Sequence, residues 1–314
     1  MPDNGQRRVL AYFGHHKCAS TWIDGILKQM AIESGRKHII VLDQMTPHGA
    51  GELWTNAPRL QTRSPFERSE LRELIDFVSA DLVSCITADR EQAEILNPAR
   101  GFHVIRDPRD IIVSAYFSHR NSHPTDGLPH LAAHRDALQE TSKEECLLLE
   151  MEFSAFELRQ LGDWNYANEK VLELKMEDVT TRPYESFLSI FRHFELMPDQ
   201  EPTNGRGQLV VSASRLVNRL SQRRSLRRLR RTIPVTGEML LGAVHARRFE
   251  ANAGGRTKGR EDVASHYRKG VAGDWQNHFT AAHREAFDRE FGELLINLGY
   301  EEDHEWAERG AIHA

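Results

Sequence analysis

The sequence predicts an α/β fold in three layers, with a mainly parallel sheet flanked by helices. Strand-like apolar runs alternate with helical patterns, which is the order that produces parallel strands joined by helices. The runs are continuously apolar rather than alternating, as in strands covered on both faces. At 314 residues with 39% hydrophobic residues, the chain is long enough to bury a large core. The expected strands are residues 9–13, 38–42, 81–87, 102–105 and 170–175.

The helices between these strands are indicated by apolar spacing and by residues that favour helix ends. A helix over residues 20–34 should end at Gly35, because glycine tolerates the left-handed backbone that follows many helices. Asp107 and Pro108 suit the first two positions of a helix running through Tyr116. Further helices are expected from residue 64, over residues 129–161, from residue 183 and from about residue 280.

No internal repeat or second domain is evident, so residues 1–314 are expected to form a single domain with a core over about residues 8–300. Within it, an arginine-rich helical insert is expected at about residues 205–235. The glycine-rich, basic stretch "NAGGRTKGR" at residues 252–260 predicts a mobile loop over about residues 250–272.

Composition excludes several classes of protein. The net charge of -5 argues against a general nucleic-acid binder. Three cysteines without paired spacing favour a reducing compartment, and no cysteine-rich zinc pattern is present. The N-terminal stretch has no apolar core of a secretory signal, and no run approaches the roughly 20 apolar residues of a membrane span. The expectation is a soluble, cytoplasmic protein that binds no nucleic acid.

The stretch "FGHHKCASTW", residues 13–22, leaves the first strand and enters the first helix. A helix N-terminus offers unpaired N–H groups and a positive dipole end, and Lys17, Ser20 and Thr21 add a charge and two hydroxyls. The stretch therefore predicts a phosphate cradle. It lacks the consecutive Gly-Lys-Ser/Thr of nucleotide triphosphatases, which positions a magnesium ion. The alternative is an ordinary strand-to-helix turn with a chance lysine.

Two later stretches carry similar chemistry. In "VIRDPRDIIVSAYFSHR", residues 104–120, Arg106 ends a strand and Ser114 lies about two helical turns on, which suits a second phosphate. The alternative is an arginine paired with Asp107 or Asp110. In "YRKGVAGDWQNHFT", residues 267–280, two cations precede a glycine that permits close approach of backbone to a ligand. The alternative there is a solvated basic loop.

Taken in order, "KCASTW", "RDPRDIIVS" and "RKGVAGDW" resemble the motifs of the cytosolic sulfotransferase family. Family members use 3′-phosphoadenosine 5′-phosphosulfate (PAPS) as sulfuryl donor. They carry a Lys-Ser-Gly-Thr-Thr-Trp-like loop, an Arg-(Asn/Asp)-Pro-(Lys/Arg)-Asp…Ser segment and an Arg-Lys-Gly-x-x-Gly-Asp-Trp segment. The resemblance covers about residues 8–300 and implies a P-loop-like sulfotransferase fold, release of 3′-phosphoadenosine 5′-phosphate (PAP) and no metal.

The resemblance assigns roles by position. Lys17 matches the lysine that stabilises the leaving phosphate. The matched donor-binding positions form three sets: Lys17, Cys18, Ala19, Ser20, Thr21 and Trp22 around the 5′-phosphate and adenine; Arg106 and Ser114 on the 3′-phosphate; and Arg268, Lys269 and Gly270 closing over it. Phe249, in "HARRFEAN", matches a second adenine-packing aromatic. An ammonium at the leaving oxygen neutralises charge without magnesium.

One position departs from the family pattern. The histidine that acts as general base after the third strand is replaced here by Ala88, in "ITADR". An ordinary alcohol acceptor still needs deprotonation. The carboxylate Asp89 ranks first as a replacement, followed by Asp43 and His48, while His15 and His16 are interpreted as lining the loop.

The sequence leaves the acceptor and the oligomeric state open. The resemblance implies a hydroxyl- or amine-bearing acceptor, which could be a small molecule, a carbohydrate or a lipid, and the loops expected to enclose it are residues 43–65, 119–130 and 232–260. In the family's dimer motif, Thr280 and Glu285 are kept but Gln276 and Ala281 replace lysine and valine, which puts the usual dimer in doubt. A kinase of related fold and a non-catalytic module that binds PAPS or a polyanion are the alternative functions.

Residues 215–231 carry eight arginines. They suit an anionic acceptor or an acidic membrane surface. The interpretation favoured from sequence is a solvated basic helix, because charge runs usually face water. That interpretation expects four leucines to be partly buried: Leu216, Leu220, Leu226 and Leu229.

Overall fold

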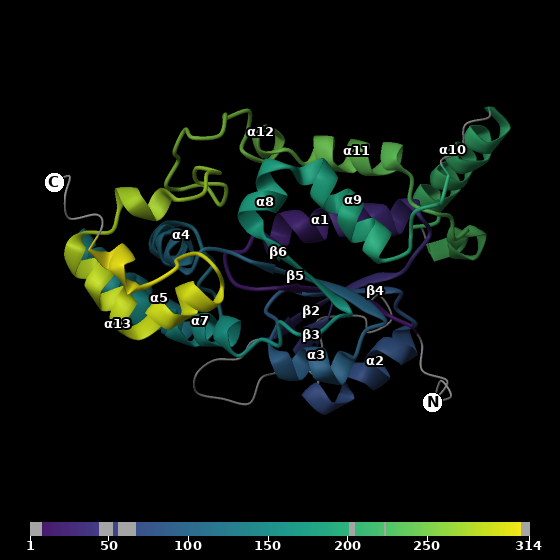
Figure 1. Ribbon diagram of the computed structural model, residues 1–314. Coiled ribbons are helices and arrows are strands. Elements are labelled where there is room, and N and C mark those ends of the chain that lie inside the picture. The colour runs from purple at the N-terminus through teal and green to yellow at the C-terminus, as the bar shows by residue number, and fades with distance from the viewer. Residues whose placement is uncertain (1–7, 44–52, 56–66, 201–204, 223, 309–314) are drawn as a thin grey trace. The chain divides into compact units, whose positions relative to one another are not determined.

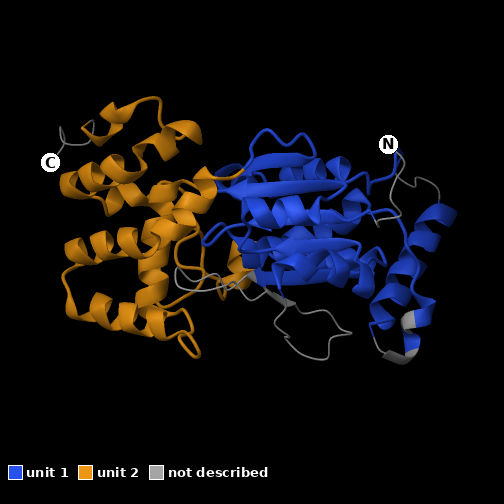
Figure 2. Cartoon of the chain, turned by 90° about the horizontal axis from the view of Figure 1, so that it is seen from below, with its two compact units in different colours: residues 1–105, 165–247 blue, residues 106–164, 248–314 orange. Residues whose placement is uncertain are grey.

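The computed structural model describes residues 8–43, 53–55, 67–200, 205–222 and 224–308. The chain divides into two compact units, and each unit is made of two separate stretches of sequence (Figure 2). Unit 1 comprises residues 1–105 and 165–247, and unit 2 comprises residues 106–164 and 248–314. That all 314 residues form one domain stays a prediction.

Unit 1 contains the sheet. Its strands are β1 (Leu10–Gly14), β2 (His38–Asp43), β3 (Leu53–Thr55), β4 (Leu82–Cys85), β5 (Arg100–Ile105) and β6 (Val171–Lys175), in the spatial order β3-β2-β4-β1-β5-β6. All neighbouring pairs are parallel except β2 and β3. The α/β fold class and the five predicted strands are therefore confirmed. Sequence reasoning missed the antiparallel β3, because three residues are too short to show a periodic pattern.

Helices cover both faces of this sheet, which gives the three layers expected (Figure 1). On one side lie α1 (Ser20–Glu33), α8 (Met176–Thr181), α9 (Pro183–His193) and α11 (Gly237–Ala246), and on the other lie α2 (Leu71–Val78) and α3 (Arg90–Leu96). The core between sheet and α1, α9 and α11 is built from buried side chains such as Phe102, Ile26, Phe187 and Met239. This burial fixes β1 and α1, and so fixes the loop between them.

The remaining elements of unit 1 are α10 (Gly205–Leu220) and the 3₁₀ turns η1 (Arg68–Glu70) and η2 (Arg224–Leu229). The predicted arginine-rich insert thus contains α10 and η2. Gly35 follows α1 with φ of 70° and lies against the chain after η2, where a Cβ would stand 2.1 Å from the Arg231 carbonyl oxygen. Glycine is required there on both grounds.

Unit 2 is helical over the residues described. Its elements are α4 (Pro108–Asn121), α5 (Pro129–Glu140), α6 (Lys143–Phe153), α7 (Ala155–Gly162), α12 (Phe249–Asn252), η3 (Asp274–Asn277), α13 (Ala281–Asn297) and η4 (His304–Ala307). The predicted cap at Asp107 is confirmed, because Asp107 accepts a hydrogen bond from the Arg109 N–H. The helix expected from about residue 280 is α13, and Thr280 caps it. Across the described parts of both units, no helix combines the length and apolarity that crossing a bilayer requires.

Candidate functional site

The loop between β1 and α1 has an unusual backbone. Lys17 and Ala19 have φ of 60° and 58°, the left-handed region that costs a residue with a side chain roughly 1–2 kcal/mol. Such strain is concentrated at ligand sites, where the surrounding structure holds the backbone in place. Ala19 is the N-cap of α1, and among the described residues no side chain caps this end and its first turn holds no acid. The positive end of α1 is therefore available to an anion.

The side chains of this loop divide into outward and inward sets. Lys17 and Ser20 are partly exposed and Thr21 is exposed, whereas Cys18 is fully buried. The Ser20 hydroxyl donates to the His15 carbonyl oxygen at 3.1 Å. Lys17, Ser20 and Thr21 are thus gathered at one helix end. The Cys18 backbone N–H donates to the His15 carbonyl oxygen at 3.2 Å, which closes the turn before α1.

Trp22 and Gly14 fix the two ends of this loop. The Trp22 indole N–H donates to the Arg247 carbonyl oxygen at 2.8 Å, and its ring packs edge-on against Phe187. A Cβ on Gly14 would lie 2.5 Å from the Tyr12 hydroxyl oxygen and 2.8 Å from the Ser20 hydroxyl oxygen. Any larger residue at position 14 would therefore force the Tyr12 hydroxyl or the Ser20 hydroxyl to move.

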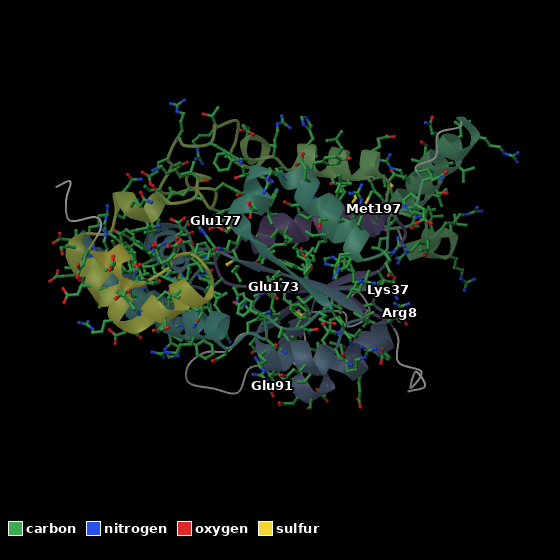
Figure 3. All side chains as sticks on the ribbon, viewed as in Figure 1. Arg8, Lys37, Glu91, Glu173, Glu177 and Met197 are labelled. Atoms are coloured by element: carbon green, nitrogen blue, oxygen red, sulfur yellow. The ribbon has the colours of Figure 1, made fainter. Side chains whose placement is uncertain are left out.

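A buried chain of three titratable side chains lies directly behind the loop. His15 Nε2 and His103 Nε2 are 2.7 Å apart, and His103 Nδ1 is 2.5 Å from a Glu173 oxygen. His103 on β5 and Glu173 on β6 are paired across the two strands (Figure 3 labels Glu173). His15 is 3% exposed and His103 is fully buried, while the Glu173 side chain is 28% exposed.

Burial decides the protonation of this His15–His103–Glu173 chain. Desolvation, with the neighbouring His103, holds the pKa of His15 well below its usual range, although nearby Asp89 opposes this. Desolvation also lowers the pKa of His103 to about 3. Both rings are therefore neutral at neutral pH. Sequence reasoning missed His103 and Glu173; the available signal was a charged or polar residue inside each of two otherwise apolar strands.

The next residues to place are Ala88, where the family has its histidine, and the three residues expected to replace that histidine as general base. The Ala88 N–H donates to the Gly14 carbonyl oxygen at 2.8 Å, so the position of the family histidine borders the residue that precedes His15. Asp89 accepts from the Gln92 N–H at 2.8 Å as the cap of α3 and forms an ion pair with Arg68. Asp43 ends β2, and His48 lies outside the described residues.

In unit 2, Arg106 and Ser114 lie before and within α4. Arg106 is 7% exposed, with one guanidinium nitrogen 3.9 Å from an Asp110 oxygen, whereas Asp107 binds the Arg109 guanidinium at 2.8 Å. Ser114 is partly exposed. Asp110 is fully buried and accepts the Gly273 N–H at 2.7 Å and the Trp275 N–H at 2.9 Å. Asp110 thus ties α4 to the segment that follows the basic loop, a role the sequence did not indicate.

The basic loop of residues 268–270 is held by one buried acid. Asp274 is 1% exposed and lies 2.5 Å from both an Arg268 nitrogen and the Lys269 ammonium. Desolvation opposes ionisation of Asp274, but hydrogen bonds from Lys269 and Arg268 outweigh it and hold its pKa well below the usual range. The Arg268 guanidinium also lies 4.4 Å from the ring centre of Phe117. Both cations are therefore fixed in position within unit 2.

Gly270 and Phe249 lie against each other. Gly270 has φ of 71°, and a Cβ there would lie 2.5 Å from the Phe249 ring. The resemblance placed both residues at the donor, and the structure brings them into contact. The predicted donor-site residues therefore form two groups, each assembled within its own unit: Lys17, Ser20, Thr21 and Trp22 in unit 1, and Arg106, Ser114, Phe249 and Arg268 to Gly270 in unit 2.

Unit 2 also contains a His–His–Glu group close enough to share a metal ion. His119 Nδ1 and His134 Nε2 lie 3.0 and 2.9 Å from the oxygens of fully buried Glu150, and the Ser154 hydroxyl donates to it at 2.7 Å. Burial raises the pKa of Glu150, but these hydrogen bonds outweigh burial and lower it. Hydrogen bonding alone accounts for this buried carboxylate, and the expectation of no metal stays a prediction.

Comparisons with known proteins find no matching family model and no matching curated protein. Solved structures with similar folds include mouse sulfotransferase SULT7A1 complexed with PAP, at 14% identity and a TM-score of 0.48, covering 98% of this chain and 89% of that one. Retinol dehydratase in complex with androsterone and inactive cofactor PAP matches at 13% identity and a TM-score of 0.45, covering 92% and 81%. A sulfotransferase from Alicyclobacillus acidocaldarius matches at 15% identity and a TM-score of 0.33, covering 69% and 95%.

Proposed function

We propose that this chain transfers a sulfuryl group from PAPS to a hydroxyl or amine of a small-molecule, carbohydrate or lipid acceptor. The observation that carries the proposal is the loop from β1 to α1. A left-handed backbone at Lys17 and Ala19 precedes an uncapped helix end with two hydroxyls, and the two other motifs of the family follow in order. The absence of the Gly-Lys-Ser/Thr succession disfavours a kinase.

In the proposed site, each phosphate of the donor has its own cations. Ser20, Thr21 and the first N–H groups of α1 hold the 5′-phosphate, with Lys17 at the oxygen that leaves. Arg106, Ser114 and the residues 268–270 hold the 3′-phosphate. Asp274 keeps Arg268 and Lys269 oriented before the donor arrives, which reduces the ordering that binding requires.

For the missing base, we propose His15, with His103 and Glu173 as positioning residues. In this proposal the His15 ring takes the acceptor proton, and one proton then passes along each hydrogen bond, from His15 to His103 and from His103 to Glu173. The acceptor oxygen bonds to sulfur as the bond from sulfur to the 5′-phosphate breaks. Passing the proton to partly exposed Glu173 avoids leaving a charge on two buried rings.

Titration calorimetry with PAP tests the donor site, and [³⁵S]PAPS turnover against a panel of alcohols, phenols and amines tests the transfer. Lys17→Ala should abolish turnover and keep much of the PAP affinity, because its charge acts mainly on the leaving oxygen. Binding of PAP without transfer to any acceptor or to water would instead support a non-catalytic module, which Ala88 at the family base position favours. Absence of PAP binding would reject the donor site itself.

A further inference from the structure

Helix α10 packs on unit 1 through its polar face. The Asn218 side-chain amide donates to the carbonyl oxygens of Glu33 at 2.9 Å and Arg231 at 2.8 Å, and its oxygen accepts the Arg231 N–H. Asn218 is fully buried, and Ser214, one turn earlier on the same face, is 6% exposed. The contact with α1 is therefore made by polar groups.

Ion pairs reinforce this polar contact. The carboxylate of Glu33, at the end of α1, has a side chain only 2% exposed and binds the Arg215 guanidinium at 2.8 Å. Arg219 pairs with the same carboxylate. Two arginines of the run thus hold α10 in place, together with Val211, which packs against the core of unit 1.

The leucines of α10 point the other way. Leu209 is 71% exposed, Leu216 59% and Leu220 45%. With exposed Ala213 they follow a 4-3-4 spacing and share one helix face, about opposite Asn218. We call these four residues the outer stripe. The expectation that Leu216, Leu220 and Leu229 would be partly buried is wrong, because Glu33 draws the arginine face inward; Leu226 is partly buried as expected.

Positive charge is concentrated in the segment that carries the outer stripe. Residues 205–231 contain nine arginines and no acidic residue, in a chain whose net charge is -5. Arg206, Arg228 and Arg231 are exposed and have no acidic partner within their own segment. A basic helix with an exposed apolar stripe has the pattern of helices that lie on lipid surfaces. Figure 1 shows α10 projecting beyond α1 and α11.

We propose that α10 and η2 form a docking surface for an anionic lipid bilayer, with the outer stripe inserted at the headgroup boundary and the exposed arginines of the same segment on lipid phosphates and carboxylates. Charge complementarity selects this occupant. Pairing α10 with α10 of a second copy would bring arginine against arginine, with no acid in the segment to offset the repulsion. Exposed apolar surface rimmed by charge is a mark of an interaction site.

Vesicle co-sedimentation of the full chain tests this proposal, with phosphatidylcholine vesicles compared with vesicles that also contain phosphatidylserine. Binding should require phosphatidylserine and weaken as salt is raised. Replacing Arg206, Arg228 and Arg231 together by Gln should lower the affinity roughly a hundredfold, at about fivefold for each arginine. Arg215 and Arg219 are left unchanged because they hold α10 against α1 through Glu33, so replacing them would disturb the fold.

A variant with Leu209, Leu216 and Leu220 changed to Gln should also lose binding. Its control is Leu241→Gln, which alters a leucine that is 53% exposed on α11 and should bind as the wild type does. Thermal unfolding of each variant checks that the fold is retained. Equal binding by the triple-leucine variant and the control, or binding without phosphatidylserine, would overturn the proposal. The proposal would also be overturned if the chain did not bind anionic vesicles and light scattering instead showed a dimer that depends on these leucines.

Discussion

Replacing Gly270 by Ala tests whether the basic loop depends on contact with Phe249. The added Cβ would sit 2.5 and 2.6 Å from two atoms of the Phe249 ring, at a φ of 71°. The left-handed backbone costs roughly 1–2 kcal/mol once a side chain is present. Displacing the ring adds an overpacking cost of about 1–3 kcal/mol. We therefore expect the variant to lose about 2–5 kcal/mol of local stability.

Gly254 supplies the matched control. It has nearly the same backbone, with φ of 65°, but a Cβ there meets nothing within 4 Å. Gly254→Ala should therefore incur the backbone cost alone. Urea unfolding and PAP calorimetry on both variants separate the two effects. PAP affinity should fall at least tenfold for Gly270→Ala and stay near the wild-type value for Gly254→Ala.

Equal unfolding energies and equal PAP affinities for the two variants would refute this reasoning, because the contact with Phe249 would then contribute nothing. Equal PAP affinities with unequal stabilities would show that the contact stabilises unit 2 without shaping the donor site. The comparison thus distinguishes a structural contact from one that positions Arg268 and Lys269.

Three further changes probe other parts of the site. Trp22→Phe removes the hydrogen bond to the Arg247 carbonyl and should cost about 1 kcal/mol in urea unfolding, and an unchanged midpoint would count against that bond. The pKa of Asp274 is depressed in the folded chain, so the stability that its carboxylate contributes is present above its unfolded pKa of about 3.9 and is lost as the pH falls below that value. The thermal unfolding midpoints of wild type and Asp274→Asn should therefore differ fully at neutral pH, and the difference should narrow below about pH 4. A difference that stays constant with pH would contradict the ion pairing of Asp274 with Arg268 and Lys269. Glu173→Gln should leave PAP affinity unchanged, lower turnover on alcohols by about a hundredfold and alter the pH profile of turnover. If the pH profile of turnover were unaltered, the proposed proton path through His103 would be excluded.

The strands and the helices next to them were predictable because their apolar runs record burial directly. The predicted strand over residues 9–13 overlaps β1, and the predicted strand over residues 102–105 lies within β5. The predicted helix over residues 20–34 ends one residue later than α1 does. These elements carry the donor loop, so its place at the carboxyl end of β1 followed from sequence.

Contacts between distant residues were not predictable. The pairing of His103 with Glu173 depends on the register of β5 against β6, which no local pattern reveals. The inverted face of α10 was missed because sequence patterns assume that leucines point inward. A single buried acid, Glu33, reverses that assumption by binding Arg215 and Arg219.

The central claim is tested most directly by titrating PAP into the full chain, once with magnesium and once with a chelator. We predict saturable binding at micromolar PAP that is the same in both, with no heat from ATP, because the loop at Lys17 lacks the arrangement that holds a magnesium ion. No saturable heat from PAP, or binding that needs magnesium and extends to ATP, would contradict the claim.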